Sequence, residues 1–162
     1  MKINSQYLKK FIISTLSLFF LLPSINMAEI HHQKTASPPS LDQQLPPCPD
    51  KPNCINSEYP DDKAHYLAPL NYPEANKAQV MTLAETIIKK MGGEIVFADQ
   101  HYLKALFSSR IFGFIDDFEL RLESASKQVH IRSASRTGYS DFGVNKRRVK
   151  EFSQQFKQQI TP

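Results

Sequence analysis

The polar residues that could do chemistry are concentrated between positions 131 and 148, in the stretch IRSASRTGYSDFGVNKRR. This stretch loses the hydrophobic pattern of its surroundings and keeps five arginines or lysines, so it favours a surface over a core. Arginines present planar donors that can bind one anion, and the start of a following helix also attracts negative charge. The candidate ligand-binding residues are Arg110, Asp116, Asp117, Arg132, Arg136, Tyr139, Asp141 and Asn145.

The same residues also fit a structural role. Asp116, Asp117 and Asp141 could hold the arginines in a hydrogen-bonded network that joins several loops, and charged networks of this kind are more often structural than catalytic. We therefore expect a structural or interaction module first. A binding module for a small anionic or lipid-like ligand comes second, and a hydrolytic enzyme third.

A serine hydrolase would need a base beside Ser133 or Ser135. The nearest histidine, His130, falls on the other face of the strand by alternation, so a catalytic triad lacks its base. The chain also has no phosphate-binding loop, no dinucleotide glycine fingerprint and no zinc spacing. The sequence therefore favours a non-enzymatic role, and we expect no cofactor and no metal.

Cys48 and Cys54 are the only cysteines, and they flank two prolines in CPDKPNC. In an exported chain such a pair most simply forms a disulfide across a short surface loop. A metal site would need two further ligands, and a reactive thiol would need a base beside it. We predict the disulfide ahead of these two alternatives.

The first 28 residues have the pattern of a secretory signal. Three lysines, at positions 2, 9 and 10, precede an apolar run over residues 11–22 that is short for a bilayer span of roughly 20 residues. We expect export to the periplasm or out of the cell, or a membrane anchor if the segment stays uncleaved. Residues 29–47 are typical of a flexible linker, and residues 48–162 have the size of one domain.

The formal net charge of +4 does not predict a nucleic-acid partner, because three of the lysines lie in the leader. A basic group in the last predicted helix favours a solvated face or contact with anionic lipid, since aromatic residues do not interleave it. This group comprises Lys146, Arg147, Arg148 and Lys150. The expected partners are therefore a cell-envelope protein, a small anionic ligand or a lipid.

Hydrophobic periodicity predicts two helices and five strands. The strands are expected at residues 65–72, 94–98, 102–108, 114–123 and 129–135, and the helices at residues 73–91 and 144–160. An antiparallel sheet with both helices packed on one face would bury every apolar stripe, which defines an α+β fold of order β-α-β-β-β-β-α. This order also occurs in the helix-grip and TATA-binding-protein-like folds.

Alternation fixes the register of the predicted hairpin at residues 114–135. It pairs Leu120 with Ile131 on an apolar face, and Glu119 with Arg132 on a face that we expect to be exposed. Asp116 falls on the apolar face, where a carboxylate requires a partner. Strand direction then brings the cysteine loop, the loop at residues 109–113 and the loop at residues 136–143 to one end of the sheet.

Three segments resemble motifs of a known family: CPDKPNC with the following Ser57, SSRIFGFIDDFELRL, and IRSASRTGYSDFGVNKRRV. Their order and spacing are similar to those of the bacterial and plastid family called domain of unknown function 1499. The resemblance covers residues 48–156, with minor departures at Ile115, Phe118 and Lys146. It implies an exported or membrane-associated single domain and no particular activity.

Overall fold

A computed structural model of the chain describes residues 43–109 and 113–160. The predicted signal and most of the predicted linker lie outside the described residues. The elements, in chain order, are β1 (Cys54–Asn56), β2 (Leu70–Asn71), α1 (Lys77–Lys90), β3 (Glu94–Ala98), β4 (Tyr102–Ser108), β5 (Ile115–Glu123), β6 (Gln128–Ser135) and α2 (Val144–Ile160). The predicted α+β class is confirmed, with one strand more than expected.

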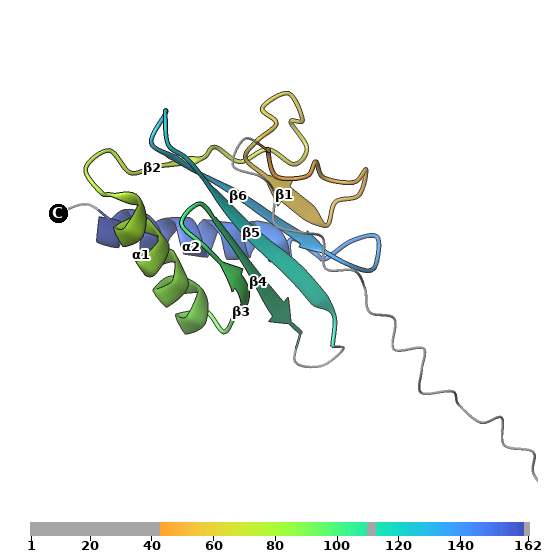
Figure 1. Ribbon diagram of the computed structural model, residues 1–162. Coiled ribbons are helices and arrows are strands. Elements are labelled where there is room, and N and C mark those ends of the chain that lie inside the picture. Colours follow the sequence, from red (N-terminus) through yellow and green to blue (C-terminus); the bar gives the residue numbers. More distant parts are fainter. Residues whose placement is uncertain (1–42, 110–112, 161–162) are drawn as a thin grey trace, which may run out of the picture. The chain divides into compact units, whose positions relative to one another are not determined.

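The strands form an antiparallel sheet in the order β1-β6-β5-β4-β3, with β2 also paired to β6 (Figure 1). The predicted hairpin register is confirmed, since Leu120 lies opposite Ile131 and Glu119 lies opposite Arg132. Side chains alternate between two faces of such a sheet. We call the face covered by the helices the core face and the opposite one the outer face.

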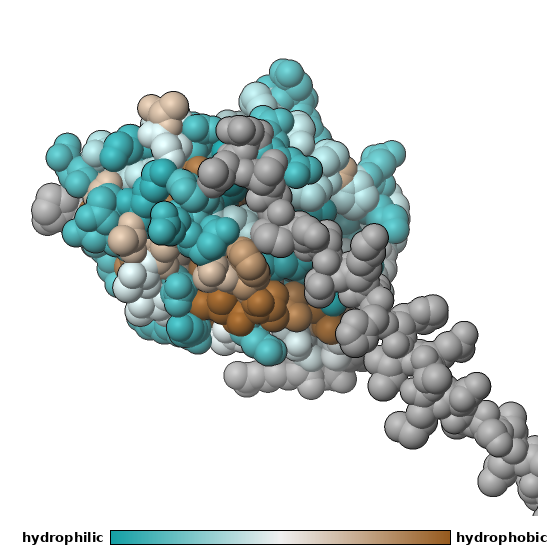
Figure 2. All heavy atoms as spheres, in the orientation of Figure 1, coloured by the Kyte–Doolittle hydropathy of each residue, from teal (hydrophilic) through white to brown (hydrophobic). Residues whose placement is uncertain are grey.

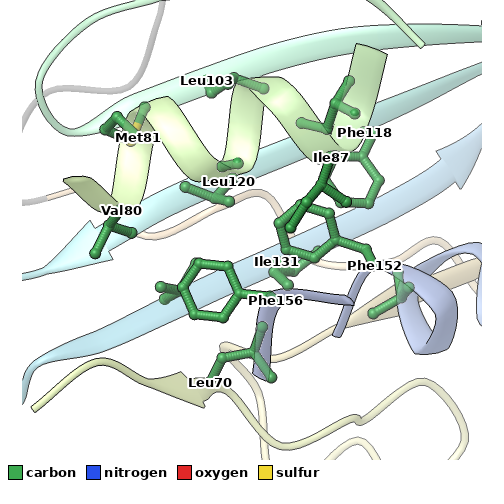
Figure 3. Packing of buried hydrophobic residues seen from close by; sticks show 14 of the residues in the cluster. Leu70, Val80, Met81, Ile87, Leu103, Phe118, Leu120, Ile131, Phe152 and Phe156 are labelled. Atoms are coloured by element: carbon green, nitrogen blue, oxygen red, sulfur yellow. The ribbon is translucent and has the colours of Figure 1, made fainter. Parts of the chain in front are cut away.

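The core lies between the core face and the two helices (Figure 3). Phe152 and Phe156 of α2 are fully buried, and the Phe152 ring lies 5.2 Å from that of Phe118 on β5. Val80 and Ile87 bring the apolar stripe of α1 onto the same residues. Hydrogen bonds between Asn145 and the hydroxyls of Ser133 and Ser135 join the start of α2 to the end of β6, where most of the candidate site residues lie.

Helix α1 begins later than predicted. Asn76 is its N-cap, and a capping box joins Asn76 to Gln79, which satisfies two backbone amides that the helix leaves open. The prediction that Pro73 opens the helix was wrong, because an Asn-x-x-Gln signal three residues further on starts it. Gly92, at φ +85, follows the C-cap and ends the helix as predicted.

The first part of the sheet also differs from the prediction. Cys54–Asn56 was expected in a loop but forms an edge strand that pairs with β6. The strand expected at residues 65–72 shrinks to the two residues of β2. A three-residue strand carries too little alternation to be recognised from sequence alone.

The outer face of the hairpin is covered, which corrects the expectation that it is exposed. Glu119 is only 6% exposed. The segments on either side of β1 lie over this region, and Leu45 and Glu58, one from each segment, are both buried.

None of the helices within the described residues is long and apolar enough to cross a membrane.

Candidate functional site

Three connections meet at the end of the sheet where β6 finishes, which we call the loop end. The Ser135 amide donates to the Asn53 carbonyl, and the Arg136 amide donates to the Ile115 carbonyl, both at 3.0 Å. The Asn53 side-chain amide donates to the Gly138 carbonyl at 3.0 Å. Two backbone hydrogen bonds and one from the Asn53 side chain therefore join the cysteine loop, the start of β5 and the connection between β6 and α2.

A buried cluster lies at the loop end of the core face. Asp116 is 8% exposed and accepts hydrogen bonds from the Ser135 hydroxyl and, at 2.8 Å, from Arg148 Nη2. Arg148 also donates to Asn145 Oδ1 at 2.7 Å, and its guanidinium lies 4.5 Å from the centre of the Phe107 ring. The carboxylate that alternation placed on the apolar face thus finds its partner on α2.

Asp141 fixes the start of α2. Its two carboxylate oxygens accept from the Gly143 amide at 2.8 Å and the Asn145 amide at 2.7 Å, and the second also accepts from the Asn145 side chain. A carboxylate is favoured there because the first amides of a helix lack acceptors and carry a partial positive charge. Asp141 is therefore engaged in holding the backbone.

Asp117 and Arg136 form a second pair on the outer face. Arg136 donates through Nε and Nη2 to the two Asp117 oxygens at 2.9 Å, and Lys104 lies 3.3 Å from the same carboxylate. Burial raises the pKa of the Asp117 carboxyl, but the hydrogen bond from Arg136 and the charge of Lys104 outweigh it, so the pKa lies below its ordinary value. The planar fork of Arg136 is occupied by this carboxylate.

Further along the outer face, Glu119 accepts from the Tyr102 hydroxyl at 2.7 Å and from Arg132 Nη1 at 2.8 Å. Burial, followed by the charge of Glu119, raises the pKa of the Tyr102 hydroxyl, so it remains a donor at every physiological pH. Arg132 Nε is buried without a hydrogen-bond partner among the described residues. The predicted cross-strand pair is present, but it is buried.

A third charged group on this face centres on Glu58. Its carboxylate accepts from Arg121 Nε at 2.8 Å and Nη2 at 3.0 Å and lies 3.4 Å from His130 Nδ1. The Ser57 hydroxyl lies 3.4 Å from that same nitrogen, so the three side chains do not form a relay through both ring nitrogens. Burial lowers the pKa of the His130 imidazole below its ordinary value, although Glu58 opposes this effect.

Residues 136–143, which we call the aromatic loop, present large side chains outward. Phe142 is 89% exposed and Tyr139 is 71% exposed. The Phe142 backbone has φ 53, a left-handed conformation that costs about 1–2 kcal/mol for an ordinary residue. Its carbonyl accepts from Arg147 Nη1 at 2.8 Å, and the Asp141 cap holds the next amide. The loop is thus held in a conformation that directs the ring away from the core.

The serines of the loop end are committed to hydrogen bonds. The Ser133 hydroxyl donates to Asn145 and the Ser135 hydroxyl donates to Asp116, and His130 lies on the opposite face of β6. Across residues 43–109 and 113–160, no group of three histidines, cysteines, aspartates or glutamates could hold a metal ion. The two serine hydroxyls therefore belong to the hydrogen-bonded cluster of the loop end.

A family model described as "Protein of unknown function (DUF1499)" matches residues 44–156, which is most of the chain. The chain belongs to the DUF1499 family. The predicted resemblance is therefore confirmed. No match was found among curated proteins.

Within this DUF1499 domain, the candidate residues separate into three places. Asp116, Asp141 and Asn145 lie together on the core side of the loop end. Asp117, Arg136 and Arg132 lie on the outer face in two ion pairs. Tyr139 is on the aromatic loop, and Arg110 lies outside the described residues.

Sequence reasoning missed two features of the DUF1499 domain. Arg148 was expected in a solvated basic group but pairs with Asp116, and its spacing of three from Asn145 and four from Phe152 could have placed it on the buried side of α2. The Glu58 group was missed because Glu58 lies in a segment without the hydrophobic periodicity of a helix or strand. The predicted cysteine pair is confirmed, since Cys48 and Cys54 lie at disulfide-bond distance.

Proposed function

We propose that this domain is a non-enzymatic interaction module of the cell envelope that docks to a partner through its aromatic loop. The observation that carries the proposal is Phe142, a large apolar side chain that is almost fully exposed on a left-handed backbone. Exposing an aromatic ring in this conformation adds nothing to the core, and strained residues of this kind cluster at functional sites. A partner that covers the ring would explain both the exposure of its apolar surface and the strained backbone that presents it.

The charges at the loop end support the same proposal. Arg136 and Arg148 each already contact a carboxylate, at 2.9 Å and 2.8 Å, and hydrogen bonds hold the aromatic loop in place. Charged pairs that satisfy each other stabilise a platform and leave little free binding capacity for a small anion. The aromatic loop is therefore the feature of this end that remains available.

The location in the cell envelope has two supports. The first 28 residues have the pattern of a secretory signal, and a disulfide between Cys48 and Cys54 is typical of proteins in oxidising compartments. Disulfides are rare in the reducing cytosol.

Position-specific photocrosslinking in the producing cells tests the proposal. A benzophenone amino acid replaces Phe142 in the full chain, and the control places it at Val96 on β3, which is 45% exposed. We expect crosslinks to a protein or a lipid from position 142 and background levels from position 96. Equal yields at the two positions, or none at position 142, would contradict docking through the aromatic loop.

The second candidate is binding of a small anionic or polar ligand at the loop end. One observation favours it: Asn53 Oδ1 is buried there without a hydrogen-bond partner among the described residues. Thermal unfolding with a panel of anionic metabolites separates the two functions. A ligand that stabilises wild type but not Arg136→Lys supports this site, and no shift with any ligand, together with a less stable Arg136→Lys, supports the structural network.

A further inference from the structure

We infer that the aromatic loop docks on the surface of an anionic lipid bilayer, an inference that rests on the proposed interaction function and names its partner. The loop and the first residue of α2 expose three apolar side chains within six positions. These are Tyr139, Phe142 and Val144, with exposed fractions of 71%, 89% and 38%. Aromatic rings favour the boundary between headgroups and acyl chains, where Tyr keeps its hydroxyl in water.

Cations flank these side chains. Lys146, Arg147 and Lys150 are exposed in the first two turns of α2, and none of the carboxylates in the described residues lies within ion-pair distance of them. Arg147 reaches back to the Phe142 carbonyl, which places its guanidinium at the base of the aromatic loop. Exposed apolar side chains next to unpaired cations are complementary to anionic headgroups above an apolar interior.

The nearest carboxylate does not oppose this arrangement. Asp141 is the only acidic residue of the aromatic loop, and both of its oxygens accept hydrogen bonds from the start of α2. Its charge therefore faces the helix amides. The carboxylates of Asp116 and Asp117 are likewise paired with Arg148 and Arg136.

A second exposed apolar surface provides a contrast. Figure 2 shows a hydrophobic patch where the ends of β3 and β4 lie in Figure 1, and β3 exposes Val96 and Phe97. The neighbouring Glu94 is exposed and acidic, and the one lysine across β4, Lys104, pairs with Asp117. This surface is apolar but its neighbouring lysine is already paired, so it serves as a control for general hydrophobic adsorption.

The chain contains no tryptophan, so a single introduced tryptophan reports on one position of the full-length protein. Phe142→Trp is mixed with vesicles of phosphatidylcholine alone or with added phosphatidylglycerol, both carrying brominated acyl chains. We expect the emission to move to shorter wavelength and to be quenched only with phosphatidylglycerol, and high salt to reverse the change. Neutralising Lys146 and Arg147 should weaken binding by about fivefold per cation.

Val96→Trp is the matched control and should keep its solvent-exposed emission. Urea unfolding confirms that both tryptophan variants are folded. An unchanged signal from the Phe142→Trp variant, or an equal response from the Val96→Trp variant, overturns the lipid inference. If position 142 nevertheless crosslinks to a protein in cells, the proposed interaction function stands with a different partner; if it crosslinks to nothing, both fail.

Discussion

Arg132, Arg136 and Arg148 each contact a carboxylate, and the pairs of Arg132 and Arg148 are largely shielded from solvent. The value of such a pair lies less in its attraction than in the cost of leaving one charge buried alone. The arginines that the sequence suggested as donors to a ligand therefore donate to carboxylates of the domain itself.

Replacing Asp116 with alanine should lower the free energy of unfolding by about 1–3 kcal/mol, because Arg148 and Ser135 lose an acceptor in a buried setting. Glu119→Ala should cost a similar amount, since Tyr102 and Arg132 both donate to it. Urea unfolding measures both. The control is Glu85→Ala, which breaks the exposed pair with Lys89 and should cost under about 0.5 kcal/mol. Similar losses in all three variants would contradict the buried networks.

The His130 imidazole should make stability depend on pH. Burial lowers its pKa in the folded protein below the ordinary value of 6.5, so the unfolded chain takes up a proton at a higher pH than the folded one. Stability should therefore fall as the pH drops below about 6.5 and should be constant above it as far as this group is concerned. His130→Gln should flatten the profile in that range. A wild-type profile that rises on acidification would contradict the assignment.

The aromatic loop and the start of α2 form one unit. Gly143 has φ +75, a backbone conformation that residues with a side chain rarely adopt, so the junction between the loop and the helix favours glycine at this position. Phe142 of this unit adopts a left-handed backbone conformation, which is unfavourable for a residue with a large side chain.

Phe142→Asn should therefore raise the free energy of unfolding by about 0.5–1 kcal/mol, because asparagine adopts the left-handed conformation more readily. Urea unfolding detects the gain, and Phe142→Leu, which keeps the conformational cost, should show none. A less stable Phe142→Asn would mean that the ring packs within the domain.

Sequence patterns predicted the long elements well and the short ones poorly. The bounds of β3, β4 and α2 agree with the prediction, because apolar residues recur there at a clear period. The three loops were predicted to meet at one end of the sheet because neighbouring strands were expected to run antiparallel. The partner of Asp116 and the cover over Glu119 depend on tertiary contacts between distant segments, which periodicity does not encode.

The cysteine loop joins β1 to the loop end through Asn53. Thiol labelling of the native, unreduced protein should fail at both cysteines, since they lie at bonding distance. Reduction should lower stability by roughly 2 kcal/mol, because the loop that the bond closes is short. Ready labelling before reduction would reject the disulfide.

The domain thus combines an internally paired loop end with an exposed aromatic loop, which we propose meets a partner. Hydrogen exchange of the full chain, with and without membranes from the producing cells, tests whether the aromatic loop docks. We expect slower exchange at amides of residues 137–147 and unchanged exchange in β3. Unchanged exchange at residues 137–147, or protection centred on β3, would contradict docking through this loop.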